Sequence, residues 1–168
     1  MSAGMTEQLE PRVHGKIISA EPEPGGAAIV TAVLDSYQRN SRDVHRLPKQ
    51  ITLTFFCPNY EAGMPRDEGK VWVEFECFAD WEGLSESIVK DASIQPAKDG
   101  GNEFEYSLNG EIFSVKQPSG SKDLYINAIV PILLTLGSRT PKAETAQTKE
   151  GTTVRLSKGR LYGHTEPG

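Results

Sequence analysis

The chain has 168 residues, an apolar content of 37% and a net charge of −5. This length fits one domain with tails and is sufficient to bury a hydrophobic core. The acidic balance argues against a protein that coats nucleic acid by charge alone. Any binding to a polyanion must therefore depend on a local basic patch.

Nothing in the sequence indicates export, a membrane span or a metal site. Residues 1–12 are polar, lack the apolar core of a signal peptide, and are expected to form a disordered N-terminal tail. No run of about 18 apolar residues occurs, so no membrane association is expected. Cys57 and Cys77 lie in apolar runs without a CxxC partner, which predicts buried free thiols and a cytoplasmic location. The three histidines are scattered, so neither a metal nor a cofactor is expected.

The first half of the chain is predicted to form strands. Residues 13–19 and 28–37 are rich in β-branched and small side chains and flank the turn sequence 21–26. Residues 51–57 and 70–79 alternate between two faces, as half-buried strands do. Along the last of these segments, one face carries Val71, Val73, Phe75 and Cys77, and the other carries Trp72, Glu74, Glu76 and Phe78.

In the second half of the chain, the spacing between apolar residues first changes from two residues to four. Leu84, Ile88 and Ala92 recur every four residues, which predicts one short helix over about 82–92. Residues 103–116 are predicted to form a hairpin, because Asn109-Gly110 is the dipeptide that type I′ turns prefer.

The last third is predicted to contain a covered strand and a separate C-terminal segment. Residues 124–136 are apolar on both faces, and Pro131 is expected to interrupt their ladder. Residues 139–168 are predicted to be a polar linker followed by a weak hairpin around Lys158-Gly159. No internal repeat is apparent.

The order of these elements predicts a mostly β fold. Several strands precede one helix, and further strands follow it, which is the order of an OB-fold, a five-stranded Greek-key barrel. We therefore expect an OB-fold-like domain over residues 13–138 with extra β elements.

Short motifs follow one another in an order that is similar to one known family. Gly15-Lys16-Ile17 precedes Glu21-Pro22-Glu23 and a Gly-Gly turn, and Trp72 and Phe78 lie six residues apart on one predicted strand face. Residues 111–125 add a strand, a Gly-bearing turn and another strand.

Over about residues 13–139, this order resembles divergent bacterial or phage single-stranded DNA-binding proteins. The resemblance implies an OB-fold, single-stranded DNA as partner, a homo-oligomer, and a gene of phage or mobile-element origin. The chain departs from the family at Glu74 and Glu76, which stand where a basic residue is usual, and at Gln117, which stands where an aromatic is frequent.

Single strands are bound by aromatic rings that stack on bases and by cations that contact phosphates. Trp72 and Phe78 are the expected stacking residues, and Phe113 is a weaker candidate; core packing is the alternative for these rings. The cations expected to contact phosphates are Arg39, Arg42, Arg46 and Lys49 in the loop 38–50, and Lys116 and Lys122 around the later turn. A solvated flexible loop is the alternative for residues 38–50.

A protein-interaction module is the alternative function. Net acidity and the carboxylates Glu74 and Glu76 would suit an accessory, inhibitor or assembly subunit that binds a protein partner. These two glutamates are the only hint of a catalytic carboxylate pair, and solvated strand glutamates are far commoner. We therefore expect a non-enzymatic protein with no catalytic residues.

Overall fold

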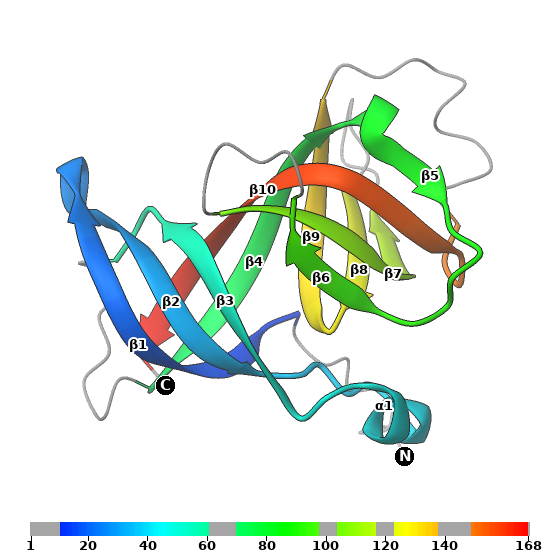
Figure 1. Cartoon of the computed structure of the whole chain (residues 1–168), viewed down its shortest axis with the longest axis horizontal. Coiled ribbons are helices and arrows are strands. Elements are labelled where there is room, and N and C mark those ends of the chain that lie inside the picture. Colours follow the sequence, from blue (N-terminus) through cyan, green and yellow to red (C-terminus); the bar gives the residue numbers. More distant parts are fainter. Residues whose placement is uncertain (1–10, 61–69, 98–103, 117–122, 138–148, 168) are drawn as a thin grey trace.

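The computed structural model describes residues 11–60, 70–97, 104–116, 123–137 and 149–167. In this part of the chain, ten strands form one sheet with the order β5-β10-β3-β2-β1-β4-β9-β8-β7-β6 (Figure 1). The predicted mostly β fold is confirmed. The strands are β1 (Val13–Glu23), β2 (Ala27–Asp35), β3 (Gln50–Cys57), β4 (Lys70–Asp80), β5 (Leu84–Glu86), β6 (Ser93–Pro96), β7 (Glu105–Lys116), β8 (Asp123–Ala128), β9 (Val130–Gly137) and β10 (Thr153–Pro167). The helical elements are α1 (Ser41–Arg46) and two 3₁₀ turns, η2 (Pro24–Gly26) and η3 (Trp81–Gly83).

A central ribbon of two antiparallel strands, β4 and β10, joins two lobes (Figure 1). Along the edge that faces away from β10, strand β4 pairs first with β1 and then with β9. Along the edge that faces away from β4, strand β10 pairs first with β7 and then with β3. Each end of the ribbon therefore carries a different three-stranded unit.

The two lobes repeat one pairing scheme. In the first lobe, β1, β2 and β3 are antiparallel neighbours, β1 pairs antiparallel with β4, and β3 is parallel to β10. In the second lobe, β7, β8 and β9 are antiparallel neighbours, β7 pairs antiparallel with β10, and β9 is parallel to β4. In the first lobe β4 is the antiparallel partner and β10 the parallel partner, and in the second lobe these two positions are reversed. Each lobe therefore forms a closed circuit of paired strands that includes both β4 and β10.

A short sequence match accompanies this repetition. Residues 13–19 read Val-His-Gly-Lys-Ile-Ile-Ser, and residues 108–114 read Leu-Asn-Gly-Glu-Ile-Phe-Ser. Both strands shift register directly after the shared isoleucine, Ile17 in β1 and Ile112 in β7. The match is too short to reveal a repeat without the strand pairings.

The shared glycines lie where the next strand packs closely against them. A Cβ atom on Gly15 would lie 2.7 Å from Leu34 Cδ2, a side-chain atom that can move. A Cβ atom on Gly110 would collide with the backbone carbonyl of Asn127. Gly110 thus allows β7 and β8 to approach, which is a packing role and not a turn role.

One hydrophobic core runs under both lobes along the inner face of the ribbon. The predicted alternation in β4 is confirmed, because Val71, Val73, Phe75 and Cys77 are all buried. The largest fully buried side chains come from both lobes and from the ribbon: Phe55, Leu34, Leu108, Ile112, Leu124, Ile126, Ile132, Leu134, Leu156 and Leu161.

The segment after β2 attaches the first lobe to the β8–β9 reversal. The Asn127 side-chain amide donates to Tyr37 O at 2.9 Å, and Tyr37 N donates to Ile129 O at 2.7 Å. Ile129 lies between the register partners Ala128 and Val130 and has a φ of 76°, which is unusual for a β-branched residue.

The predicted helix over 82–92 is wrong. This segment contains η3, the short strand β5 and an extended loop. Pairing of β5 with β10 supplies backbone hydrogen bonds that compete with a helix, and Asn109 Nδ2 donates to Val89 O and Asp91 O at 2.9 Å each. The described α-helix instead lies at Ser41–Arg46, within the predicted loop 38–50.

Three further expectations about the later strands are also wrong. Asn109-Gly110 lies inside the continuous strand β7, because β7 has strand neighbours that leave no room for a turn there. Residues 124–136 form two strands that reverse at Ile129, and Pro131 is paired with Asn127. Of the C-terminal segment, residues 153–167 form one long strand with a bulge near Gly159, which belongs to the same sheet as β1–β9.

Gly110→Ala should destabilise the protein more than Gly15→Ala. The added methyl at Gly110 meets a backbone carbonyl of a paired strand, so overpacking should cost about 1–3 kcal/mol or more. At Gly15 the closest atom belongs to a side chain, and the nearest backbone atom, Val33 O, is 3.2 Å away, so a smaller backbone shift is needed. Urea unfolding of both variants measures the difference, and equal losses would contradict the assigned packing role.

Candidate nucleic-acid interface

The outer face of β4 carries the side chains that could contact a ligand. From one end to the other, these are Lys70, Trp72, Glu74, Glu76, Phe78 and Asp80. Trp72 and Phe78 are both half-buried. Six residues of strand separate them by about 20 Å. They therefore belong to two different surroundings, each completed by residues from other strands.

The first surrounding is the Trp72 cluster, which consists of Arg12, His14, Trp72 and Glu166. His14 of β1 is the cross-strand partner of Trp72, and their rings stack at 3.5 Å with an interplanar angle of 27°. The Arg12 guanidinium lies 4.2 Å from the centroid of the Trp72 ring. Arg12 Nη1 also contacts Glu166 Oε2 at 3.2 Å. The indole is thus covered in part by two cationic or titratable side chains.

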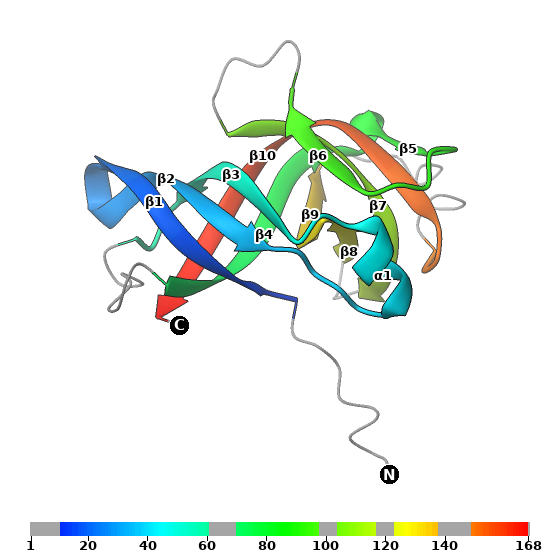
Figure 2. The same cartoon turned by 60° about the horizontal axis from the view of Figure 1, so that its bottom comes forward.

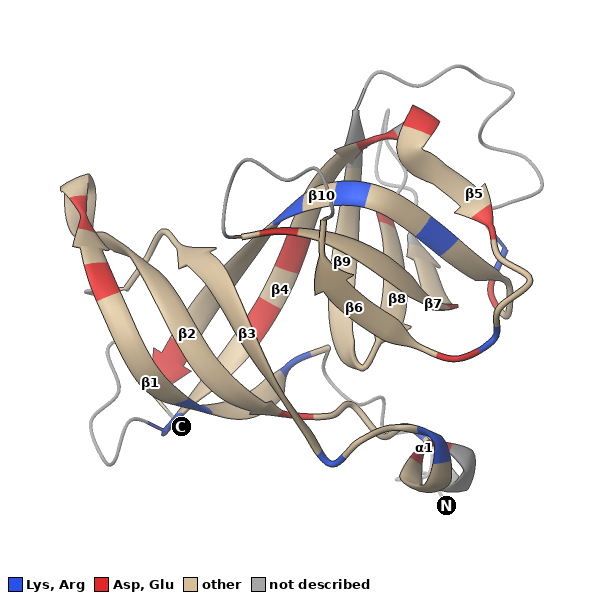
Figure 3. Cartoon of the chain, viewed as in Figure 1, with Lys and Arg blue, Asp and Glu red and all other residues tan. Residues whose placement is uncertain are grey.

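A basic groove adjoins the Trp72 cluster. Lys16 of β1 and Lys70 of β4 are cross-strand partners one pair further along the same face. With His14, Asp35 and Gln50, they line an open groove of about 560 Å³ to which all four strands β1–β4 contribute. Figure 3 shows this basic end of β1 and β4 beside the C-terminus. In this groove the basic side chains outnumber the single carboxylate.

The second surrounding is the Phe78 cluster, which brings together four aromatic rings from distant segments. Tyr162 lies at its centre, with ring centroids 4.9 Å from Phe78, 5.2 Å from Phe56 and 6.3 Å from Phe104. Phe56 and Phe104 are 5.9 Å apart. Phe78 packs against another aromatic ring but is not part of the hydrophobic core. The alternative that Phe78 is a core residue is therefore correct only in that the ring has packing partners.

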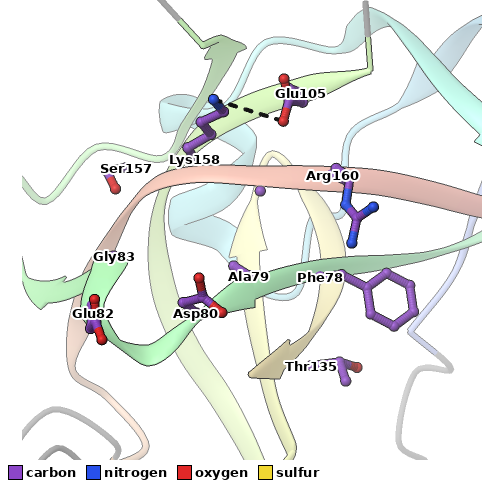
Figure 4. Close-up of a pocket in the computed structure, with 11 residues that line it drawn as sticks. Phe78, Ala79, Asp80, Glu82, Gly83, Glu105, Thr135, Ser157, Lys158 and Arg160 are labelled. Carbon is purple, nitrogen blue, oxygen red and sulfur yellow. Dashed lines mark ion pairs between the residues drawn. The ribbon is translucent and has the colours of Figure 1, made fainter. Parts of the chain in front are cut away.

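A larger groove of about 760 Å³ begins at Phe78 and is of mixed charge (Figure 4). Lys158 Nζ lies 3.9 Å from Glu105 Oε2 across it, and Arg160 extends from β10 toward β4. Asp80 and Glu82 line the same groove. Three carboxylates against two cations make this groove less suited to phosphate than the groove at Lys16.

An acidic belt consists of Glu74 and Glu76 of β4, which lie between the two clusters, and of Asp123 of β8, which lies at the level of Phe78. Thr135 Oγ1 donates to Glu76 Oε2 at 2.6 Å, which holds that carboxylate in place. Burial raises the pKa of Tyr125, and the three belt carboxylates raise it further. The belt therefore produces a negative potential that opposes a phosphate chain running from Trp72 to Phe78.

The helix α1, which lies within the predicted basic loop, is beside β7 and β8 of the second lobe (Figure 2). The Arg39 guanidinium lies 4.5 Å from the centroid of the Phe113 ring, and Phe113 contacts Tyr37 and Tyr125. The predicted hairpin would place Tyr106 opposite Phe113. Tyr106 is instead buried, and its hydroxyl accepts a hydrogen bond from Thr54 N at 2.9 Å.

The remaining predicted cations are not gathered at one place. Arg46 lines a small cavity with Arg39 and Lys90, and Lys49 is exposed. The side chains of Arg42 and Lys116, and the whole of Lys122, lie outside the described residues. The structure thus brings Arg39 to Phe113, and of the predicted loop 38–50 it brings only the last residue, Gln50, to the described lining of the groove beside Trp72.

Sequence reasoning missed the residues that surround Trp72. Lys70 could have been found, because strand alternation places it on the Trp72 face. Arg12, His14 and Lys16 reach that face only because β1 pairs with β4, and no local pattern reveals a pairing between strands so far apart in sequence.

Comparisons of the chain with family models, curated proteins and solved structures gave no match. In the described residues, no helix is long and apolar enough to cross a membrane. Nor does that part of the chain contain a group of three or more His, Cys, Asp or Glu side chains that could hold a metal ion.

The two thiols are unsuited to nucleophilic chemistry. Both cysteines are free and buried, as the sequence predicts. Burial raises the pKa of Cys77 to about 12. Burial also raises the pKa of Cys57, although a hydrogen bond with Thr165 partly opposes this shift. Because the thiolate is the reactive form, neither residue forms a candidate catalytic site.

Stability should fall with alkaline pH partly because of Cys77. Its folded-state pKa of about 12 exceeds the ordinary value of 9.0, so the folded thiol keeps a proton that the unfolded thiol releases. The free energy of unfolding should decrease between these values by up to about 1.4 kcal/mol per pH unit. Urea unfolding from pH 8 to pH 11 should show a shallower decline in Cys77→Ala than in the wild type. Parallel declines would contradict this assignment.

Proposed function

We propose that the protein binds single-stranded nucleic acid, without catalysis, through the Trp72 cluster and the basic groove at Lys16 and Lys70. The observation that carries the proposal is the stacked His14–Trp72 pair on the outer face of the sheet, next to a groove in which basic side chains outnumber carboxylates. Base–aromatic stacking contributes about 1–3 kcal/mol per base, and it tolerates any sequence because every base has a flat face.

The topology of the first lobe supports an OB-fold-like barrel as the scaffold. Its circuit passes through β1, β2, β3, β10 and β4, which is five strands, and the chain order is that of a Greek key. OB-folds bind oligonucleotides on an outer strand face flanked by loops. The basic groove lies on such a face, with β7, β8 and β9 as the extra β elements of the second lobe.

Arg12 need not prevent a base from reaching Trp72. Its ion pair with the exposed Glu166 contributes about 0–1 kcal/mol, and an exposed cation–π contact contributes about 0.5–1 kcal/mol. A stacked base would recover about 1–3 kcal/mol. The stacked base therefore offsets a loss of about 0.5–2 kcal/mol from these two contacts.

The acidic belt limits the footprint of the strand. Phosphates that follow the first lobe past Trp72 would meet Glu74 and Glu76, so binding should involve a few nucleotides at the basic end. This accounts for a chain that is acidic as a whole and yet offers a local site for a polyanion.

A second candidate function is binding of a basic segment of a protein partner. The acidic belt and the carboxylates of the Phe78 groove favour it, because opposite charges attract such a segment and the Phe78 cluster offers apolar contact. This candidate predicts binding of a lysine-rich peptide and no binding of an oligonucleotide.

Trp72→Ala should weaken binding of a fluorescently labelled oligo-dT by about 5-fold to 150-fold, which corresponds to the loss of about 1–3 kcal/mol of stacking. Fluorescence anisotropy at low salt, with labelled DNA and RNA oligonucleotides, measures the affinity. Trp72→Phe should retain most of it because a ring remains. Phe113→Leu, on the second lobe, is the matched control and should bind as the wild type does. No binding by the wild type to either oligonucleotide would overturn the proposal.

A further inference from the structure

The recurring glycines align the two lobes residue by residue. The residues that follow these glycines, Lys16 and Glu111, are paired with Val33 of β2 and Asn127 of β8. Val33 and Asn127 therefore occupy corresponding positions. This alignment reveals where one lobe contains residues that the other lobe lacks.

Strands β2 and β3 continue one pair beyond their counterparts in the second lobe. Two residues after Asn127, strands β8 and β9 reverse at Ile129. Two residues after Val33, strand β2 instead continues, and Asp35 pairs with Gln50 of β3. Because one lobe closes without such a pair, the shared fold does not require it.

The imidazole of His14 lies between the Trp72 ring and the basic groove. Strand β1 lies between β4 and β2 in the sheet, so Trp72 covers His14 from the side of β4. His14 lines the groove together with Asp35 and Gln50, whereas Trp72 is not part of the described lining. A flat ring that enters the groove from the side of β2 can therefore stack on His14 and extend the existing stack by one ring.

The groove is large enough for such a ring. Its volume of about 560 Å³ lies within the range of small-ligand sites, about 300–1,000 Å³. Histidine is one of the side chains on which the bases of single strands stack. A base in the groove would thus have its face on His14 and its edge toward the polar pair of β2 and β3.

Asp35 supplies two hydrogen-bond acceptors at this edge. Its side chain is exposed, and Gln50 Nε2 donates to Asp35 Oδ1 at 3.2 Å, which holds the carboxylate in place. An ionised carboxylate only accepts hydrogen bonds, and each of its oxygens has capacity for more than one. Asp35 is the one carboxylate among the described residues that line the groove. It opposes phosphate, so the ligand group that it favours is a pair of neighbouring N–H donors.

Guanine is the base whose edge matches a carboxylate. Its ring N1–H and its exocyclic N2 amine donate side by side. Adenine and cytosine place a ring acceptor beside their amine, and thymine and uracil flank a single N–H with two carbonyls. On every base except guanine, the second carboxylate oxygen would therefore meet an acceptor. Bases in single strands are recognised at this edge while their faces are stacked.

We propose that the basic groove is a guanine site, in which the base stacks on His14 and donates from N1 and N2 to the Asp35 carboxylate that Gln50 holds in place. This inference rests on the proposed function and deepens it. It adds a base preference at one position to a strand that is otherwise bound by stacking and charge. DNA and RNA share the guanine edge, so the preference applies to both.

The test compares guanine with hypoxanthine, which lacks only the exocyclic amine. A labelled oligo-dT with one central dG should bind about 5-fold or more tightly than the same oligonucleotide with one central deoxyinosine. This factor is the lower limit for a bidentate contact to a base edge. Fluorescence anisotropy at low salt measures both affinities. Equal affinities would overturn the guanine site.

Asp35→Asn is the matched variant, because it keeps the shape of the side chain and replaces one acceptor by a donor. The ratio of the dG affinity to the deoxyinosine affinity should fall toward one. Both oligonucleotides carry the same phosphates, so this ratio is independent of the change in net charge. Asp91→Asn removes an exposed carboxylate from the loop before β6 and should keep the wild-type ratio. A wild-type ratio in Asp35→Asn would contradict the role of its carboxylate.

Failure of the guanine site and failure of the proposed function give different results. If the wild type binds both oligonucleotides equally and Trp72→Ala weakens both, the guanine site is overturned and the function stands. Calorimetric titration with guanosine and inosine monophosphates covers a free nucleotide. If the wild type binds neither oligonucleotide but prefers guanosine monophosphate, the guanine site stands and the strand-binding function is overturned. If it binds none of these ligands, both proposals fail.

Discussion

The antiparallel ladder between β4 and β10 is the interaction on which both lobes depend. Each strand is long enough to serve one lobe with its first half and the other lobe with its second half. The free edge of β4 passes from β1 to β9, and that of β10 passes from β7 to β3. Loss of this ribbon would open both circuits at once, because β3 and β9 close their lobes only through it.

The two faces of the ribbon carry different physical roles. The inner face is mostly apolar and joins the cores of both lobes, so it must be packed without gaps. The outer face is released from that requirement, and its character changes along its length from basic at Lys70, through the acidic belt, to aromatic at Phe78. Function is most readily placed on this outer face, because substitutions there leave the core intact.

Comparison of the two lobes distinguishes residues that the shared fold requires from residues that are specific to one lobe. Gly15 and Gly110 recur because a neighbouring strand approaches the backbone in both lobes. Their outward neighbours do not recur: Lys16 corresponds to Glu111. The electrostatic asymmetry of the molecule thus arises from side chains that packing does not constrain, and it is a basis of the function proposed for the first lobe.

The sequence alone determined the mostly β class, the strands over 51–57 and 70–79 and the buried thiols, because alternation and burial are local properties. The sequence wrongly predicted a helix over 82–92, where part of the segment pairs with β10. It also wrongly predicted a turn at Asn109-Gly110, which lies inside β7 and pairs with neighbouring strands. Only the tertiary structure decided which side chains surround Trp72. Those neighbours come from strands paired across more than fifty residues, and no local pattern encodes such a pairing.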